Sequence, residues 1–305
     1  MDEAIILRTL QENYDEKITD VEFLRDGGGK TYIAHAENKK YLLKIAGNTF
    51  HDTIRQSVNM ICFLSEKHFP VPSIVKTRSG KAMLEQSSTD EDSLFILSEY
   101  ITGKEPDLTQ RAEQIGDLIG QLHALLSIYE GKFVKRDFHF FIERYVDILH
   151  RKQYPKAEIY AEIGKKLWTY VKDCPVSVCH GDLHRGNLLE TADGKIYLLD
   201  FDTICTAPRM FDVMVMCDMS DYFHLKPDDV AKTTTVYNHF LKGYTKQIAL
   251  TEEERASLPA WIAIRHFQLQ ATIVEIYGID CIDERFIDDQ LQWIQEWCNI
   301  TGVFL

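Results

Sequence analysis

Hydrophobic and polar residues alternate along much of the first hundred residues, in short runs that are typical of β-strands. Residues 31–47, "TYIAHAENKKYLLKIAG", alternate on both sides of a polar turn and predict a hairpin. A glycine-rich turn at 27–29 joins this hairpin to an earlier strand. Residues 52–68 have helical spacing, with Asp52 as the expected N-cap. The nearly continuous apolar run of "SLFILSEYITG", residues 93–103, predicts a buried strand.

The spacing of apolar residues changes after Gly103, and the rest of the chain is predicted to be mainly helical. A core-facing stripe at intervals of three and four residues consists of Ile115, Leu118, Ile119, Leu122 and Leu125. Near the chain end, Thr251 and Glu254 form a capping box that opens a further helix. The pattern therefore predicts a strand-rich part, a short hinge near residues 99–103 and a larger helical part.

The glycine run with Lys30 and Thr31 has letters in common with a phosphate-binding P-loop. That motif also requires glycine five residues before the last glycine, where this chain has Leu24. A P-loop is followed by a helix, whereas the alternation here predicts a strand. The run is therefore interpreted as a turn between two strands.

Composition narrows the function classes. The formal net charge of −13 argues against binding nucleic acid or anionic lipid through a basic surface. From residue 205 onward there are 15 acidic against 8 basic side chains, and two interpretations stay open: a solvated acidic surface, or a wall that attracts a cationic substrate. No apolar stretch is long enough to span a membrane, and the N-terminus lacks the shape of a signal peptide. Seven cysteines without a C-x-x-C pair indicate free thiols, so we expect a cytoplasmic protein.

One segment, residues 178–203, concentrates the chemistry: "VCHGDLHRGNLLETADGKIYLLDFDT". A predicted hairpin strand ends this segment. The polar residues that it collects are His180, Asp182, His184, Asn187, Asp200 and Asp202. A zinc site is the weaker interpretation, since the two histidines lie on a loop and the H-E-x-x-H glutamate is missing. Carboxylate and amide oxygens suit Mg²⁺, which bridges substrate phosphates, and one aspartate would remain as a base.

"HGDLHRGNLL" followed by "LLDFD" resembles the signature of the aminoglycoside phosphotransferase and choline kinase group, which has a protein-kinase-like fold. The resemblance implies an α+β, two-lobed protein-kinase-like fold. A small antiparallel β-sheet N-lobe with one helix, residues 1–101, would bind nucleotide. A larger helical C-lobe, residues 102–305, would carry the catalytic loop and the substrate site.

The resemblance also implies roles for single residues in the chemical segment. Asp182 would accept or orient the proton of the substrate hydroxyl, while Asn187 and Asp200 would hold Mg²⁺. Four residues would support the site: Asp202 at the metal or loop, Asp212 through loop backbone amides, His184 in packing or substrate contact, and Arg185 near incoming substrate. Positioning and charge neutralisation supply most of the catalysis of phosphoryl transfer, so these residue types are the expected ones.

In the N-lobe, the resemblance makes the glycine run the turn over the nucleotide phosphates. Gly27, Gly28 and Gly29 would let backbone N–H groups approach them. Lys44 would pair with the α- and β-phosphates. The backbone at Glu99 and Ile101 would bind adenine.

The chain departs from the group at one position of the N-lobe. Relatives carry a helix glutamate that pairs with the strand lysine, and its place here falls near Ser57. No acid lies within a helical turn of Ser57. Either another acid substitutes, the register differs, or Lys44 is held differently.

The function that the resemblance implies is transfer of the γ-phosphate of ATP or GTP, with Mg²⁺, to a hydroxyl of a small molecule. An aminoglycoside or an amino alcohol, both cationic, is the expected kind of acceptor. Two alternatives stay open: a stress-response-type Ser/Thr protein kinase of the same fold, and a nucleotide-binding pseudokinase, which the missing helix glutamate favours. The expected partners are nucleotide and substrate, without nucleic acid or membrane, and the sequence leaves the oligomeric state unknown.

Overall fold

The computed structural model describes residues 2–26, 29–47, 51–86 and 92–304. The chain packs into two compact units, one of Met1–Pro106 with Arg185–Thr203 and one of Asp107–His184 with Ile204–Leu305. The first is called the sheet unit and the second the helical unit. Residues 185–203 pack with the sheet unit, although they follow the first part of the helical unit in the chain. The sequence-based division into 1–101 and 102–305 stays a prediction.

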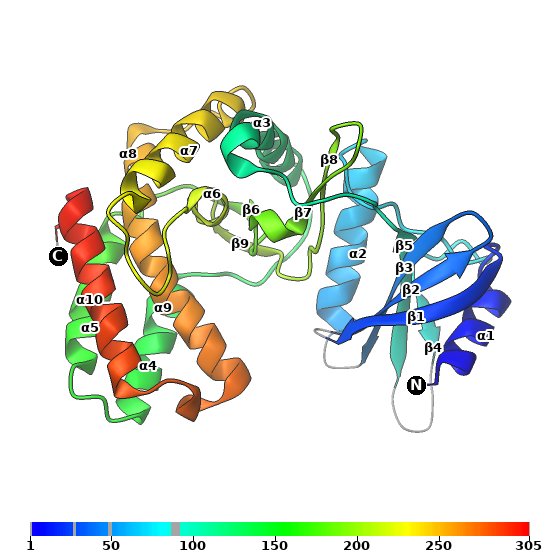
Figure 1. The fold of residues 1–305 in the computed structure, drawn as a ribbon, viewed down its shortest axis with the longest axis horizontal. Helices are drawn as coiled ribbons and strands as arrows, with labels where there is room; N and C mark the ends of the chain where they lie inside the picture. Colours follow the sequence, from blue (N-terminus) through cyan, green and yellow to red (C-terminus); the bar gives the residue numbers. More distant parts are fainter. Residues whose placement is uncertain (1, 27–28, 48–50, 87–91, 305) are drawn as a thin grey trace. The chain divides into compact units, whose positions relative to one another are not determined.

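The sheet unit is built on five strands in the order β1-β2-β3-β5-β4, with antiparallel pairing throughout (Figure 1). Their bounds are β1 Ile18–Asp26, β2 Lys30–Ala36, β3 Lys40–Gly47, β4 Leu84–Gln86 and β5 Ser93–Glu99. Each strand that the alternation predicts is present. The small antiparallel sheet of the expected α+β fold is therefore confirmed.

Both faces of this sheet are covered, which explains the continuous apolar run of β5. Helix α1, Glu3–Asn13, shares one hydrophobic core with Phe95 and Leu97, while α2, His51–Glu66, shares another with Leu94 and Ile96 (Figure 1). Helix α1 was not predicted from the sequence. The expectation that Asp52 caps α2 is wrong, because the helix already includes His51 and Asp52 lies in its first turn.

A second hairpin completes the sheet unit and carries part of the chemical segment. Strand β7, Leu188–Glu190, pairs with β8, Ile196–Leu198, and the short helix η3, Arg185–Asn187, precedes them. Two backbone hydrogen bonds join Lys104 and Glu190, at 2.7 and 3.0 Å, and fix the hairpin to the chain after β5. These bonds explain why the segment packs with the sheet.

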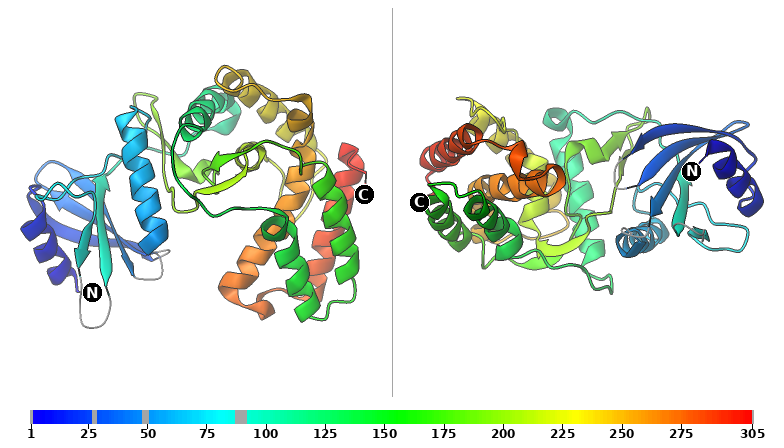
Figure 2. Two further views of the ribbon diagram at one scale, coloured as in Figure 1. Left: turned by 180° about the vertical axis from the view of Figure 1, so that it is seen from behind. Right: turned by 90° about the horizontal axis from the view of Figure 1, so that it is seen from below.

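The helical unit contains most of the helices, and a two-stranded sheet of β6, Val176–Cys179, and β9, Cys205–Pro208 (Figure 2). Its helices are α3 Leu108–Leu126, η2 His139–Glu143, α4 Arg144–Arg151, α5 Ala157–Thr169, α6 Met210–Cys217, α7 Asp229–Tyr244, α8 Glu252–Ala256, α9 Leu258–Tyr277, η4 Ile279–Cys281 and α10 Glu284–Thr301. The helices α3 and α7 pack closely, since a Cβ at Gly243 would lie 1.9 Å from the carbonyl oxygen of Glu113. The capping box of Thr251 and Glu254 is present at α8.

Two further expectations about the whole chain can be compared with the structure. All seven cysteines are free thiols, as predicted. Within the described part of the chain, no helix combines the length and the apolar character that crossing a membrane requires. The helices of the helical unit, together with the sheet, confirm the predicted α+β fold class.

Candidate active site

A row of side chains across the sheet forms one wall of a cavity in the sheet unit. The strand register places Arg25 opposite Thr31, Thr31 opposite Lys44, and Lys44 opposite Ile96. All four line the cavity, so they lie on the same face of the sheet. The remaining lining residues are Leu42, Ile54, Ser57, Val58, Ile61, Pro72, Ile74, Ser98, Leu198, Leu199, Asp200, Phe201 and Asp202. A mostly apolar cavity with a few converging charges is typical of a ligand site.

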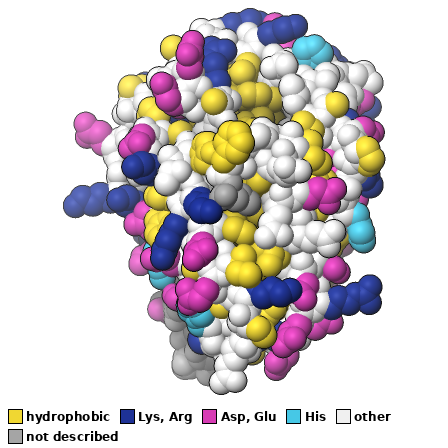
Figure 3. All heavy atoms as spheres, turned by 90° about the vertical axis from the view of Figure 1, so that its left-hand side faces the viewer, with side chains coloured by type: hydrophobic (Ala, Val, Ile, Leu, Met, Phe, Trp, Pro, Cys, Tyr) yellow, Lys and Arg dark blue, Asp and Glu magenta, His cyan; other side chains and the backbone are white. Residues whose placement is uncertain are grey.

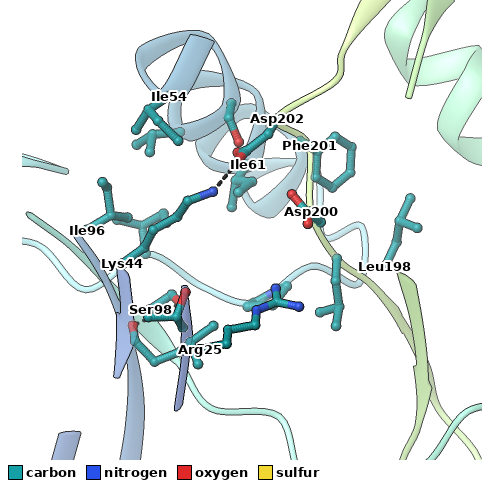
Figure 4. Close-up of a pocket in the computed structure, with 17 residues that line it drawn as sticks. Arg25, Lys44, Ile54, Ile61, Ile96, Ser98, Leu198, Asp200, Phe201 and Asp202 are labelled. Carbon is teal, nitrogen blue, oxygen red and sulfur yellow. Dashed lines mark hydrogen bonds and ion pairs between the residues drawn. The ribbon is translucent and has the colours of Figure 1, made fainter. Parts of the chain in front are cut away.

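Lys44 is paired with Asp202 inside this cavity. The ammonium of Lys44 donates a hydrogen bond to the Asp202 carboxylate, and the two side chains point toward one another in Figure 4. Their side chains are 23% and 25% exposed, so the ion pair is screened by water only in part. The pairing answers the question that the missing helix glutamate raises. The acid that holds Lys44 comes from the segment after β8.

Asp200 and Asn187 lie near the open end of the β7–β8 hairpin, where their backbones are close. The backbone N–H of Leu199 donates to the carbonyl oxygen of Asn187 at 2.9 Å, which places Asn187 beside the residue before Asp200. Asp200 has a φ of +60°, an uncommon value for an aspartate, while the following Phe201 is fully buried and anchors the turn. An amide oxygen and a carboxylate are hard ligands, so this pair fits a divalent cation such as Mg²⁺.

The glycine turn is described only in part. Gly27 and Gly28, expected at the phosphates, lie outside the described residues. Gly29 has a φ of +127°, and a Cβ there would lie 2.8 Å from the carbonyl oxygen of Ile45. Only glycine meets both conditions, because this backbone region is strained for residues with a side chain.

The expected adenine contacts are not brought to the cavity. Ser98 lines it, but Glu99 and Ile101 are not among its lining residues. The backbone N–H of Glu99 donates to the carbonyl oxygen of Ser73 at 2.9 Å. Their adenine-binding role therefore stays a prediction.

Arg185, expected near incoming substrate, has a protein partner in this structure. Its guanidinium Nε lies 2.7 Å from Oε1 of Glu105, and both side chains are well exposed. An exposed ion pair of this kind contributes little stability, so it does not prevent another role. The substrate contact stays a prediction.

In the helical unit, Asp182 lies on the loop after β6 with its carboxylate beside His184. The distance from Oδ2 of Asp182 to Nε2 of His184 is 3.5 Å, and both side chains are about half exposed. Burial by itself would raise the pKa of Asp182, but the hydrogen bond and charge of His184, with the charges of His180 and Arg265, hold that pKa below its usual value. These neighbours therefore favour the ionised form of the Asp182 carboxylate.

Asp212 of α6 holds the backbone of the same loop. Its fully buried carboxylate accepts hydrogen bonds from the backbone N–H groups of His180, at 2.7 Å, and Gly181, at 2.9 Å. Nε2 of His123 lies 3.1 Å from the carboxylate, and Nδ1 of His123 lies 2.7 Å from the hydroxyl of Tyr244. These contacts are the kind that the predicted supporting role requires.

The side chains of His123, Cys179 and Asp212 approach one another closely enough to raise the question of a metal. Burial, together with the charge of Asp212, raises the pKa of the Cys179 thiol well above its usual value. Sγ of Cys179 donates to the carbonyl oxygen of Ala207 at 3.4 Å, and the Asp212 carboxylate already accepts from two backbone N–H groups. The cluster is therefore interpreted as packing behind the loop.

One charged residue that lines the cavity, Arg25, was not identified from the sequence, and the partner of another, Asp202, was not foreseen. Arg25 extends into the cavity from the sheet (Figure 4). Its place before the glycine run could have drawn attention to it, but nothing in the sequence fixed the face on which it lies. Asp202 was expected at the metal or loop, and its pairing with Lys44 joins residues that lie 158 positions apart in the chain.

Comparisons with known proteins agree with this fold. The chain aligns at 23% identity over 306 residues with the amicoumacin kinase of Bacillus subtilis, covering 92% of this chain and 88% of that one. It is 30% identical over 210 residues to the homoserine kinase of Zymomonas mobilis subsp. mobilis, and the match spans 64% of this chain and 61% of that kinase. Among solved structures, amicoumacin kinase hAmiN in complex with AMP-PNP, Ca²⁺ and Ami superimposes with a TM-score of 0.77 at 19% identity, over 99% of this chain and 95% of that one.

These structural matches establish a protein-kinase-like fold. The model of the phosphotransferase enzyme family matches residues 20–247, which include the strand lysine and the whole chemical segment. The chain belongs to the phosphotransferase enzyme family, and the predicted class of enzyme is confirmed.

Proposed function

We propose that the protein transfers the γ-phosphate of ATP or GTP to a hydroxyl group of a small molecule that carries an amine. The observation that carries the proposal is the convergence of Lys44, Asp200 and Asp202 on one cavity. A cation and two carboxylates lining one cavity on the face of a sheet suit a nucleotide phosphate bound with a metal. Relatives whose names specify homoserine and amicoumacin kinases support a small acceptor.

The proposed chemistry divides among a few residues. Asp182, held ionised by its neighbours, would orient the acceptor hydroxyl and take its proton. Lys44 would bind the nucleotide phosphates, and Asn187 with Asp200 would hold Mg²⁺. Bound there, the metal neutralises charge on the phosphates.

The acidic residues of the helical unit bear on the kind of acceptor. Of the acidic residues expected to attract a cation, Asp221 binds Lys226 at 2.6 Å and Asp283 caps α10, so both have structural partners. On the face shown in Figure 3, basic and acidic side chains are interspersed and form no continuous acidic wall. On this face no acidic wall forms, so a local site is proposed to select a cationic acceptor.

Asp218, at the end of α6, is the acid that we consider for such a site, and its Oδ1 already accepts from the backbone N–H and the hydroxyl of Ser220, at 2.9 and 2.6 Å. Burial raises the pKa of Asp218, a penalty that a bound ammonium group would offset. The charge of Arg265 acts on both Asp182 and Asp218, so a carboxylate-bearing acceptor is also worth testing. Amino alcohols and hydroxy amino acids are accordingly the first acceptors to compare.

The test is transfer of labelled γ-phosphate by the full chain in Mg²⁺, from ATP and separately from GTP. The acceptor panel holds aminoglycosides, choline, ethanolamine, homoserine, methylthioribose and a generic protein. We expect one small acceptor to be labelled, and Asp182→Asn to lower kcat by about 10²- to 10⁴-fold. Asp193→Asn, in the exposed turn between β7 and β8, is the matched control and should leave the rate unchanged.

Other outcomes would replace the proposal with one of its alternatives. Labelling of the generic protein alone would indicate a protein kinase. Nucleotide binding without transfer to any acceptor would favour a pseudokinase. Absence of nucleotide binding would contradict the roles given to Lys44, Asn187 and Asp200.

A further inference from the structure

Lys44 is a partly buried cation in a cavity whose other walls are mainly apolar. Its backbone position is fixed from both sides, because β3 pairs with β2 at Thr31 and with β5 at Ile96. The direction of its long, flexible side chain is not fixed by this pairing. An ammonium group in such surroundings requires a counter-charge, and that counter-charge determines where the group points.

The helix that faces Lys44 does not provide this charge. Four residues of α2 at helical spacing line the cavity: Ile54, Ser57, Val58 and Ile61. Ser57 is buried and uncharged. The acids of α2 are Asp52 in its first turn and Glu66 at its last residue, five and nine positions away from Ser57, and neither lines the cavity.

The counter-charge comes instead from the turn after β8. Asp202 binds Lys44, and the fully buried ring of Phe201 anchors the backbone immediately before it. Leu198 at the end of β8 is also tied to the sheet unit, since its backbone N–H donates to the carbonyl oxygen of Pro70 at 2.9 Å. The carboxylate that holds Lys44 is thus placed by the same short turn that carries Asp200.

We propose that Asp202 is the positioning residue of Lys44, in the place of a carboxylate on α2. It orients the ammonium group toward the nucleotide phosphates, and its contribution is a negative charge beside Lys44. The inference rests on the proposed function, since it concerns how that reaction positions its nucleotide. If Asp202 contributes only a negative charge beside Lys44, a carboxylate at another position of the cavity should serve as well. A carboxylate introduced at position 57 should therefore compensate for the loss of the one at position 202.

The experiment compares Asp202→Asn with two double variants, Asp202→Asn/Ser57→Glu and Asp202→Asn/Asn59→Glu. Asn59 is exposed on α2, so it carries the same added charge without facing the cavity. We expect Asp202→Asn to lower kcat/KM for ATP by about 10- to 100-fold, the size of one hydrogen bond to a charged group. Ser57→Glu should recover the value to within about threefold of wild type, whereas Asn59→Glu should recover nothing.

Because Ser57 is buried, Ser57→Asp serves as a shorter second variant in the same background, and the Tm of every protein is measured. Folded double variants at position 57 that stay as slow as Asp202→Asn would overturn the proposal. So would an Asp202→Asn protein with wild-type kinetics. A rise in the Mg²⁺ concentration required by Asp202→Asn, without rescue from position 57, would make Asp202 a metal ligand and overturn it as well. A wild-type protein that transfers no phosphate would contradict the proposed function itself, which is a separate result.

Discussion

The loop that carries Asp182 and the cavity that holds Lys44 are stabilised in different ways. The loop backbone is fixed by Asp212, a fully buried carboxylate that accepts two backbone N–H bonds. In the cavity, Lys44 is held by one side-chain pair that is about one quarter exposed. Buried hydrogen bonds to a charge are costly to break, whereas partly exposed ion pairs can exchange partners at little cost.

This difference indicates that mutations in the two regions should have different effects. In the proposed function the loop would present a proton acceptor in one geometry, and its contacts with Asp212 are buried. The cavity would release Lys44 and Asp200 to a ligand, and the Lys44 pair is partly accessible. Mutations behind the loop should therefore act on stability and rate together, while mutations in the cavity should act first on nucleotide affinity.

The largest effect is expected from Asp212→Asn. The backbone N–H groups of His180 and Gly181 bind different oxygens of the carboxylate, and an amide has only one oxygen. One of the two N–H groups therefore loses its acceptor in the variant, and the other loses a charged one. We expect the free energy of unfolding to fall by about 2–3 kcal/mol and kcat to fall with it. Denaturant unfolding and the phosphate-transfer assay measure the two effects.

Asp229 provides a matched control for this variant. It is also buried, and it accepts backbone hydrogen bonds from Asp221, at 3.0 Å, and Lys226, at 2.9 Å. Both of these bonds reach Oδ2, so the single amide oxygen of Asp229→Asn can still accept them; this variant should cost less free energy of unfolding than Asp212→Asn and leave kcat near wild type. Equal losses of kcat in both variants would show that Asp212 contributes stability alone.

Gly29→Ala tests whether the backbone conformation at position 29 requires glycine. The added Cβ meets the carbonyl oxygen of Ile45 at 2.8 Å, and the φ of +127° is unfavourable for alanine. We expect a loss of about 1–3 kcal/mol in the free energy of unfolding and weaker nucleotide binding, since Ile45 is next to Lys44. Gly80→Ala is the control, with a φ of +79° but no atom within 4 Å of the new Cβ. Equal nucleotide affinity in the two variants would contradict the expectation.

Arg25→Gln removes the second cation of the cavity and should have a smaller effect. Arg25 is exposed, so its attraction to a nucleotide phosphate is screened by water and salt. We expect the Kd for ATP to rise between about 1.5- and 5-fold at low salt, and the difference to shrink as salt is added. Lys30→Gln, on the neighbouring strand but not lining the cavity, should leave the Kd unchanged. If Lys30→Gln raised the Kd for ATP as much as Arg25→Gln does, the net charge of the protein, and not the position of Arg25 in the cavity, would account for the effect.

The two regions also differ in how much of them could be predicted from the sequence. Asp182, Asn187, Asp200 and Asp202 lie within one short segment of the sequence, so the resemblance to a known family could assign roles to all four, although Asp182 lies in the helical unit and the other three in the sheet unit. The partner of Lys44 could not be predicted, because it depends on where the turn after β8 packs against the sheet. The face on which Arg25 lies could not be predicted from alternation either. In an unbroken strand Phe23 and Arg25 would lie on the same face. A register shift between them turns Arg25 to the cavity face instead.

The helices that were not predicted have physical reasons of their own. Every residue of α6 is buried, so the helix has no polar face that would reveal a period. Helix α7 contains "TTTV", a β-branched run with low helix propensity, and forms because it packs closely on α3. In both cases tertiary burial stabilises a helix that local sequence does not favour.

The smallest effect, and the one most specific to the loop, is expected from His184→Gln. Although burial tends to raise the pKa of Asp182, His184 lowers it, and histidine is cationic in acid solution, where that influence is strongest. Removing the charge should raise this pKa, so the acid limb of the kcat profile should move to higher pH while the rate near pH 7 changes little. His139→Gln is the control: His139 pairs with Glu143 at 3.2 Å on η2, away from the loop sequence, and should not move the limb. Circular dichroism at each pH separates titration from acid unfolding. A limb that moves to lower pH, or that moves equally in both variants, would show that His184 does not set the charge state of Asp182.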